Sequence, residues 1–322
     1  MRIARIDLDG VARAAIVADG AARPLPEDVG VLDLLGAEPA DRERLGARAT
    51  TELALDQVRL LAPVQPPSMR DFSVFEQHVA GAVKVTGGPD AAVFPIWYER
   101  PFCYFSNPTE VSGPGAEVAA PPGSDQLDLE LEVAAIIGRA GRDIAPGDAG
   151  AHIAGYTIWN DWSSRDLAAR ELRLPFGFCK AKDFANTLGP WIVTPDELEP
   201  YRDGDRLDLA MKATINGVEL GGDTLASMAW SFEELVAFAS MGASVAAGDV
   251  IGSGTCGGGC LYELWGHAQA LEPPPLQPGD VVTLEVDGIG TLTNTVVAQT
   301  VAPLEFPPAR TTRTSATAEA RS

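Results

Sequence analysis

Basic residues are scarce in this 322-residue sequence. Lysine and arginine total 24 against 45 aspartates and glutamates, which gives a formal net charge of −21. Such a field repels phosphate, so we expect neither a nucleic-acid partner nor an acidic membrane surface as a partner. The apolar runs are also too short to span a bilayer, and this too predicts no membrane partner.

Cysteines are few, and a signal peptide is lacking. The four cysteines, Cys103, Cys179, Cys256 and Cys260, do not form a disulfide framework for a chain of this length. The opening MRIARIDLDG places charges inside any possible apolar region, so no signal peptide is predicted. We therefore expect a cytoplasmic protein with reduced thiols.

Several common functional motifs are absent or incomplete. The sequence has no GxSxG elbow and no P-loop, which disfavours a serine hydrolase or a nucleotide phosphate site. Gly252, Gly254 and Gly257 spell GxGxxG, but the motif runs into two more glycines and a predicted short strand rather than a helix. Cys256 and Cys260 lack neighbouring ligands at zinc spacing and are interpreted as structural.

The hydrophobic content, 46%, is that of an ordinary globular protein. Strands and turns, including a hairpin over residues 2–20, indicate a small β-rich N-terminal domain over 1–67, which ends at the proline-rich segment PVQPPS. Residues 68–306 are strand-rich with few helices, which predicts a larger α+β, mainly β domain of mixed and antiparallel sheets. Residues 307–322 show no core-forming pattern and are predicted to be disordered.

The most informative segment is SDQLDLELEV, residues 124–133. Leucine and valine alternate with Asp128, Glu130 and Glu132, a period of two that predicts a half-buried strand. The acidic face has two interpretations. It is either a solvated outer face, or a site for a hard divalent cation such as Mg²⁺, Mn²⁺ or Ca²⁺.

Other polar residues stand out one by one. Asp161 follows a predicted strand and is either a helix N-cap or a third carboxylate for the cation. Asp71 and His78 lie seven residues apart, so a continuous helix would put both on one face. Glu263 lies in LYELW, a predicted strand that is apolar on both faces, so this carboxylate needs a histidine partner or has a raised pKa. His152 and His267 are interpreted as structural.

Over residues 68 to about 300, the order and spacing of these segments resemble the fumarylacetoacetate hydrolase family. DFSVFEQH, LDLELEVA, WNDWSSRDL, KAKDFANTLGPW and GSGTCGGGCLYEL each match a family segment. By this resemblance the metal ligands are Asp71, Glu130, Glu132 and Asp161. It places catalytic roles on His78, Glu263, Lys182 and Arg165. Substrate contacts would come from Thr255 and from an aromatic loop with Phe102 and Tyr104, of which we take Tyr104.

The resemblance implies a homodimeric, Mg²⁺-dependent (or Mn²⁺- or Ca²⁺-dependent) hydrolase. It would cleave a carbon–carbon bond in a small anionic 1,3-diketone or acylpyruvate, with His78 and Glu263 activating water. The same resemblance covers hydratases, isomerases and decarboxylases of 2-oxo acids, which act through a metal-bound enolate. A non-catalytic metal-binding protein is a third alternative. Ala168 stands where many members have glutamine, so the substrate stays open.

Overall fold

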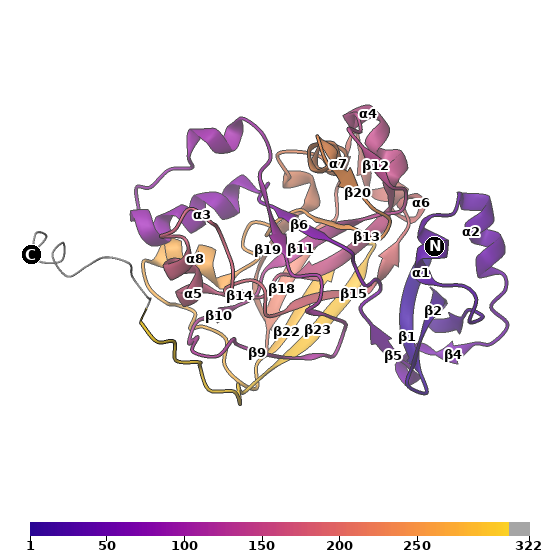
Figure 1. Ribbon diagram of the computed structural model, residues 1–322, viewed down its shortest axis with the longest axis horizontal. Coiled ribbons are helices and arrows are strands. Elements are labelled where there is room, and N and C mark those ends of the chain that lie inside the picture. Colours follow the sequence, from indigo (N-terminus) through magenta and orange to yellow (C-terminus); the bar gives the residue numbers. More distant parts are fainter. Residues whose placement is uncertain (309–322) are drawn as a thin grey trace, which may run out of the picture.

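A computed structural model describes residues 1–308 of the chain. The N-terminal strands form one end of a large sheet (Figure 1). They are β1 (Arg2–Leu8), β2 (Val11–Ala18), β3 (Ala21–Pro24), β4 (Leu53–Ala54) and β5 (Arg59–Leu61). β1 and β2 form the expected hairpin, in which Asp9 and Gly10 have positive φ angles of 53° and 83°. The short helices α1 (Val31–Leu35) and α2 (Pro39–Gly46) lie over this end.

The large sheet continues from β1 into the rest of the chain, in the order β1-β15-β13-β11-β21-β6-β7. These strands are β6 (Met69–Phe72), β7 (Cys103–Ser106), β11 (Leu131–Ile137), β13 (Ile153–Asn160), β15 (Asn186–Val193) and β21 (Val250–Gly252). Most neighbours are antiparallel, but β21 pairs with β6 in parallel, as does β8 (Val111–Ser112) with β15. The mainly β class with mixed sheets is confirmed.

A second sheet packs against the large one. Its order is β19-β18-β22-β23-β9, with bounds β9 (Glu117–Ala119), β18 (Ala210–Ile215), β19 (Val218–Thr224), β22 (Val281–Val286) and β23 (Gly290–Val297). Leu131 and Val133 of β11 share one buried cluster with Met211 of β18 and Leu284 of β22. The largest hydrophobic core therefore lies between the two sheets. Short pairs complete the strands: β10 (Leu127–Asp128) with β14 (Ser163–Ser164), β12 (Gly141–Arg142) with β20 (Ser244–Val245), and β16 (Arg202–Asp203) with β17 (Arg206–Leu207).

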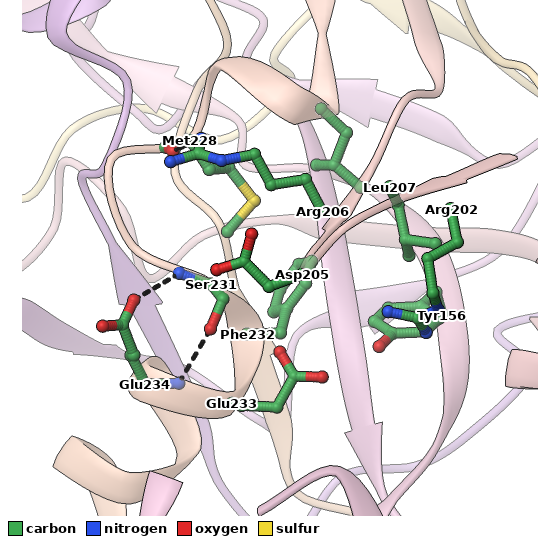
Figure 2. A pocket seen from close by; sticks show the side chains of 11 residues that line it. Tyr156, Arg202, Asp205, Arg206, Leu207, Met228, Ser231, Phe232, Glu233 and Glu234 are labelled. Carbon is green, nitrogen blue, oxygen red and sulfur yellow. Dashed lines mark hydrogen bonds between the residues drawn. The ribbon is translucent and has the colours of Figure 1, made fainter. Parts of the chain in front are cut away.

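Three of the later helices form a group. α3 (Glu76–Gly87), α5 (Arg165–Glu171) and α8 (Leu261–Ala268) lie together at the end far from the N-terminal strands (Figure 1). α4 (Pro146–Ala149), α6 (Pro195–Leu198) and α7 (Phe232–Ser240) lie elsewhere. α7 packs Phe232, Leu235 and Val236 into the core. It begins with a capping box in which Ser231 and Glu234 each bond the other's backbone N–H, beside a small pocket of about 40 Å³ (Figure 2).

Two local predictions are wrong. LYELW is not a strand: Leu261 and Trp265 are both buried, four residues apart on one face of α8. The Asp71–His78 segment is not one helix, because Asp71 lies on β6 and α3 begins only at Glu76. A short apolar segment such as LYELW fits a buried strand or a buried helix, so hydrophobic periodicity does not distinguish the two.

The acidic strand also differs from its expected form. It is split into β10 and β11, and Asp128, Glu130 and Glu132 are all buried. The solvated outer face is therefore excluded. Of the tail predicted to be disordered, residues 309–322 lie outside the described residues.

Two expectations of the composition can be compared with the structure. The four cysteines are free thiols. Over residues 1–308, no helix is long and apolar enough to cross a bilayer.

Candidate active site

Three carboxylates meet near the ends of three strands of the large sheet, of which β13 and β11 are neighbours and β21 separates β11 from β6. Asp71 is on β6, Glu132 is on β11, and Asp161 follows β13. Each offers one oxygen, and these oxygens all lie within 4.8 Å of one another. The three side chains are buried, and Asp71 accepts a hydrogen bond of 3.1 Å from the Gly254 N–H. Asp161 does not cap a helix: Ser164 precedes α5 at that position.

The donor set fits a hard divalent cation. Glu132 Oε2 and Asp161 Oδ1 are buried and have no hydrogen-bond partner within residues 1–308, a costly state that an ion would relieve. Burial and the charge of Asp161 raise the pKa of Asp71 to about 8. Burial raises the pKa of Asp161 to about 6, although Lys182 acts in the opposite direction. Carboxylate oxygens are the ligands that Mg²⁺, Mn²⁺ and Ca²⁺ prefer.

Glu130, the fourth expected ligand, lies beside this cluster with its oxygens bound to two cations. Lys182 Nζ bonds Glu130 Oε2 and, at 2.5 Å, Asp161 Oδ2, while Arg165 donates to Glu130 Oε1 at 2.7 Å. Burial would raise the pKa of Glu130, but Lys182 and Arg165 outweigh it and the pKa falls well below its ordinary value. Glu130 is thus a fixed anion that holds the two cations at the edge of the cluster.

Asp128 was not singled out as a site residue from the sequence. Its Oδ2 accepts from Arg165 Nε at 2.8 Å and from the Tyr262 N–H at 3.0 Å, and its Oδ1 accepts from the Leu261 N–H at 2.8 Å. It therefore ties α5 to the N-terminus of α8, where an anion is favoured. The signal was present in the sequence, because Asp128 starts the same alternation as Glu130 and Glu132.

His78 and Glu263 come from α3 and α8 and face each other. His78 Nδ1 lies 3.8 Å from Glu263 Oε2, longer than a hydrogen bond but within ion-pair distance. Burial raises the pKa of Glu263, yet His78 and the Gly258 N–H outweigh it, and the pKa is lowered. Of the two states expected for this carboxylate, the histidine partner is the one observed. Cys260 caps α8 through the Glu263 N–H and lies 3.5 Å from His78 Nδ1.

This pairing depends on a close crossing of α3 and α8 at two glycines. A Cβ on Gly266 would lie 2.0 Å from the Gly81 carbonyl oxygen, and a Cβ on Gly81 would lie 2.3 Å from Glu263 Cγ. Both contacts are far inside van der Waals distance, so any side chain would force the helices apart.

Gly266→Ala should therefore destabilise the fold and reduce turnover together. Overpacking of this kind costs about 1–3 kcal/mol of unfolding free energy, and separation of the helices moves Glu263 away from His78. Gly147→Ala is the matched control, because its Cβ would meet nothing within 4 Å. Thermal unfolding and kcat should be measured for both variants. A Gly266→Ala protein as stable and active as the parent would contradict this role for the crossing.

The two remaining expected contacts lie in the same place. The Tyr104 hydroxyl donates to Asp161 Oδ2, and Thr255 Oγ1 lies 3.4 Å from Glu132 Oε1. Both line a pocket of about 810 Å³ together with Asp71, His78, Glu130, Arg165, Lys182 and Phe102. The structure thus brings all the site residues expected from the sequence to one region, with Glu132, Asp161 and Glu263 behind the pocket wall.

The raised carboxyl pKa values predict how stability depends on pH. Without metal, the folded protein keeps protons on Asp71 and Asp161 above their ordinary pKa of 3.8, whereas the unfolded chain has released them. The unfolding free energy of the metal-free protein therefore falls as pH rises from about 4 to about 8. An ion needs these carboxylates ionised, so its stabilising effect should grow with pH.

Thermal midpoints with and without Mg²⁺ at pH 6 and pH 8 test this dependence. The difference between loaded and metal-free protein should be larger at pH 8, and Asp71→Asn should reduce the change. A difference that shrinks as pH rises would contradict the assignment of these groups.

Comparison with known proteins agrees with this geometry. The fumarylacetoacetate (FAA) hydrolase C-terminal family model matches residues 69–297, and an Rv2993c-like N-terminal model matches residues 1–63. The oxaloacetate tautomerase YisK of Bacillus subtilis is 30% identical over 76% of this chain and 74% of its own. The fumarylacetoacetase of Arabidopsis thaliana is 29% identical over 76% of this chain and 71% of its own.

A solved structure extends the likeness to three dimensions. The fumarylacetoacetate hydrolase of Exiguobacterium antarcticum superposes with a TM-score of 0.74 at 28% identity, and covers 93% of this chain and 100% of its own. The family model covers well over half of the residues, including the acidic cluster and the His78–Glu263 pair. The chain therefore belongs to the fumarylacetoacetate hydrolase family.

Proposed function

We propose that the protein is a divalent-metal-dependent hydrolase that cleaves a carbon–carbon bond in an acylpyruvate or related 1,3-diketone. The observation that supports this most strongly is the His78–Glu263 pair. It adjoins the acidic cluster, and neither residue is one of the three clustered carboxylates. A base held by a carboxylate is what hydrolysis needs in addition to an ion.

Asp71, Glu132 and Asp161 would hold the ion, with Glu130 beside them. Mg²⁺ fits this oxygen set, as do Mn²⁺ and Ca²⁺. When bound, the ion supplies Lewis-acid polarisation of a substrate carbonyl.

The side chains of the protein perform the proton transfers. With a proton on Nδ1 directed at Glu263, Nε2 of His78 is the free base that accepts a proton from water. Glu263 then stabilises the imidazolium, as the carboxylate does in a catalytic triad. The resulting hydroxide adds to the acyl carbonyl carbon. The bond between this carbon and the neighbouring methylene then breaks, which releases the carboxylic acid and leaves the electron pair on the methylene as the enolate of pyruvate. The His78 imidazolium returns its proton to that carbon, which gives pyruvate and restores the base.

Lys182 and Arg165 stabilise the negative charge that develops on this leaving group. Both are buried and remain charged. Burial lowers the pKa of Lys182, but Asp161 and Glu130 outweigh it and raise the pKa. Burial likewise lowers the pKa of Arg165, but Glu130 and Asp128 outweigh it and raise the pKa. Fixed cations in a water-poor site are effective at this task. They also provide the positive region that an acidic protein needs to admit an anionic substrate.

A second candidate function is tautomerisation of a 2-oxo acid such as oxaloacetate. The name of the Bacillus subtilis relative supports it, and an enolate needs only the acidic cluster and the two cations. The purified protein should be incubated with Mg²⁺ and either acylpyruvates or enol oxaloacetate, while the ultraviolet absorbance of the diketone or enol is followed and products are identified. The proposal predicts pyruvate and a carboxylic acid from acylpyruvates. Fast ketonisation of oxaloacetate with no acylpyruvate cleavage would favour the tautomerase.

A further inference from the structure

We propose that the substrate carries a single carboxylate head and an apolar acyl tail, which binds between helices α3 and α5. This inference deepens the proposed function and depends on it only for the head-group end. The pocket of about 810 Å³ has two chemically different parts. The part beside the acidic cluster contains the charged side chains described above, and the other part is built mainly from small and apolar residues.

Each helix carries a site residue in its first turn and then presents small and apolar residues to the pocket. α3 starts near His78 and continues along the pocket with Val79, Ala82, Val83 and Thr86. α5 starts with Arg165. Ala169 of this helix and Leu172, its C-cap residue, follow along the pocket wall. From His78 to Thr86 the stripe extends about 12 Å, at the rise per residue of an α-helix.

Aromatic rings link the head-group end to this tail channel. Tyr104 and Phe178 pack edge to face with ring centroids 5.1 Å apart, and Lys182 Nζ lies 5.6 Å from the Tyr104 ring. Phe102 joins them in the pocket wall. A substrate held by Lys182 at its charged end would therefore pass over apolar ring surface before it reaches the helices.

Charge in the lining decides between an apolar tail and a second carboxylate. Among the pocket-lining residues of the described part of the chain, Arg173 alone carries charge outside the catalytic end. The α3 side chains that line the pocket beyond His78 offer a single polar group, the Thr86 hydroxyl. A second carboxylate along this wall would lose hydration without meeting a cation among the α3 side chains that line the pocket, whereas each apolar carbon gains from leaving water.

Binding of N-alkyl oxamates to the Mg²⁺-loaded protein tests this inference without turnover. These compounds present a carboxylate and a neighbouring carbonyl but contain no bond that the enzyme would cleave. By calorimetry, the dissociation constant should fall roughly fourfold for each methylene added over a short series. A matched series with a terminal carboxylate should bind more weakly at every length.

Variants locate the effect. Ala82→Phe should flatten the dependence of affinity on chain length, because Ala82 lines the pocket and the new ring would fill the channel. Ala80→Phe is the control, because Ala80 is on the same helix but not among the pocket-lining residues, and this variant should keep the dependence. Thermal midpoints show whether each variant is folded. An affinity that is independent of chain length, or absent throughout the series, would overturn the inference.

Tighter binding of the series with a terminal carboxylate than of the N-alkyl oxamates would also overturn the inference. If Arg173→Ala removed that difference in affinity, the substrate would be assigned as a diacid. Failure of the proposed hydrolysis is distinguishable, since the length dependence of binding would remain while acylpyruvates stayed intact.

Discussion

His78→Ala should bind metal normally and lose acylpyruvate cleavage by roughly 10²–10⁴-fold, the usual contribution of a general base. His78 lies on α3 outside the three-carboxylate cluster, so its removal leaves Asp71, Glu132 and Asp161 in place. The loss should appear in kcat, because the imidazole acts on the attacking water rather than on substrate affinity. Metal content and thermal midpoint, measured on the same preparation, establish that the variant is loaded and folded.

Glu263→Gln should also lose turnover, because it removes the charge that stabilises the imidazolium. The double variant should be little worse than either single one, since residues that act as a unit are not additive. His152→Ala is a suitable control, because His152 bonds Arg139 at another place in the fold. A lowered thermal midpoint with unchanged turnover in Glu263→Gln would make this carboxylate structural. A folded, loaded His78→Ala protein that cleaves at the parent rate would refute the base.

Removal of the metal should abolish activity altogether, and Mg²⁺ or Mn²⁺ should restore it. Asp161→Asn should bind Mg²⁺ far more weakly, because it removes one of the three clustered carboxylates. Asp148→Asn is the matched control at an exposed position on α4. Calorimetric titration of Mg²⁺ and elemental analysis measure both effects. Full activity after exhaustive chelation, with no metal detected, would contradict the cation site.

Much of the site could be predicted because five segments of the chain match segments of a known family in order and spacing. The alternation around Glu130 and Glu132 predicts a strand but leaves open whether its acidic face is solvated, and the structure shows these carboxylates buried. The pattern did not separate their roles. Glu132 belongs to the carboxylate cluster, whereas Glu130 is bound by Lys182 and Arg165. That difference depends on which chain segments fold over the strand, and no local pattern contains it.

The helix that carries Glu263 shows a second limit. In LYELW every residue except the glutamate is apolar, so the segment fits a buried strand or a buried helix equally well. The deciding feature is the neighbouring crossing of α3 and α8 at Gly81 and Gly266, which lie 185 positions apart in the sequence. Tertiary packing of this kind overrides local preference.

Cleavage of an acylpyruvate in water labelled with oxygen-18 tests the central claim most directly. If His78 delivers water to the acyl carbonyl, each turnover of the Mg²⁺-loaded protein should place one labelled oxygen in the released carboxylic acid. The pyruvate carboxylate should gain no label. The result that would contradict the account is an unlabelled acid, or an acylpyruvate that changes its tautomer while its carbon skeleton stays intact.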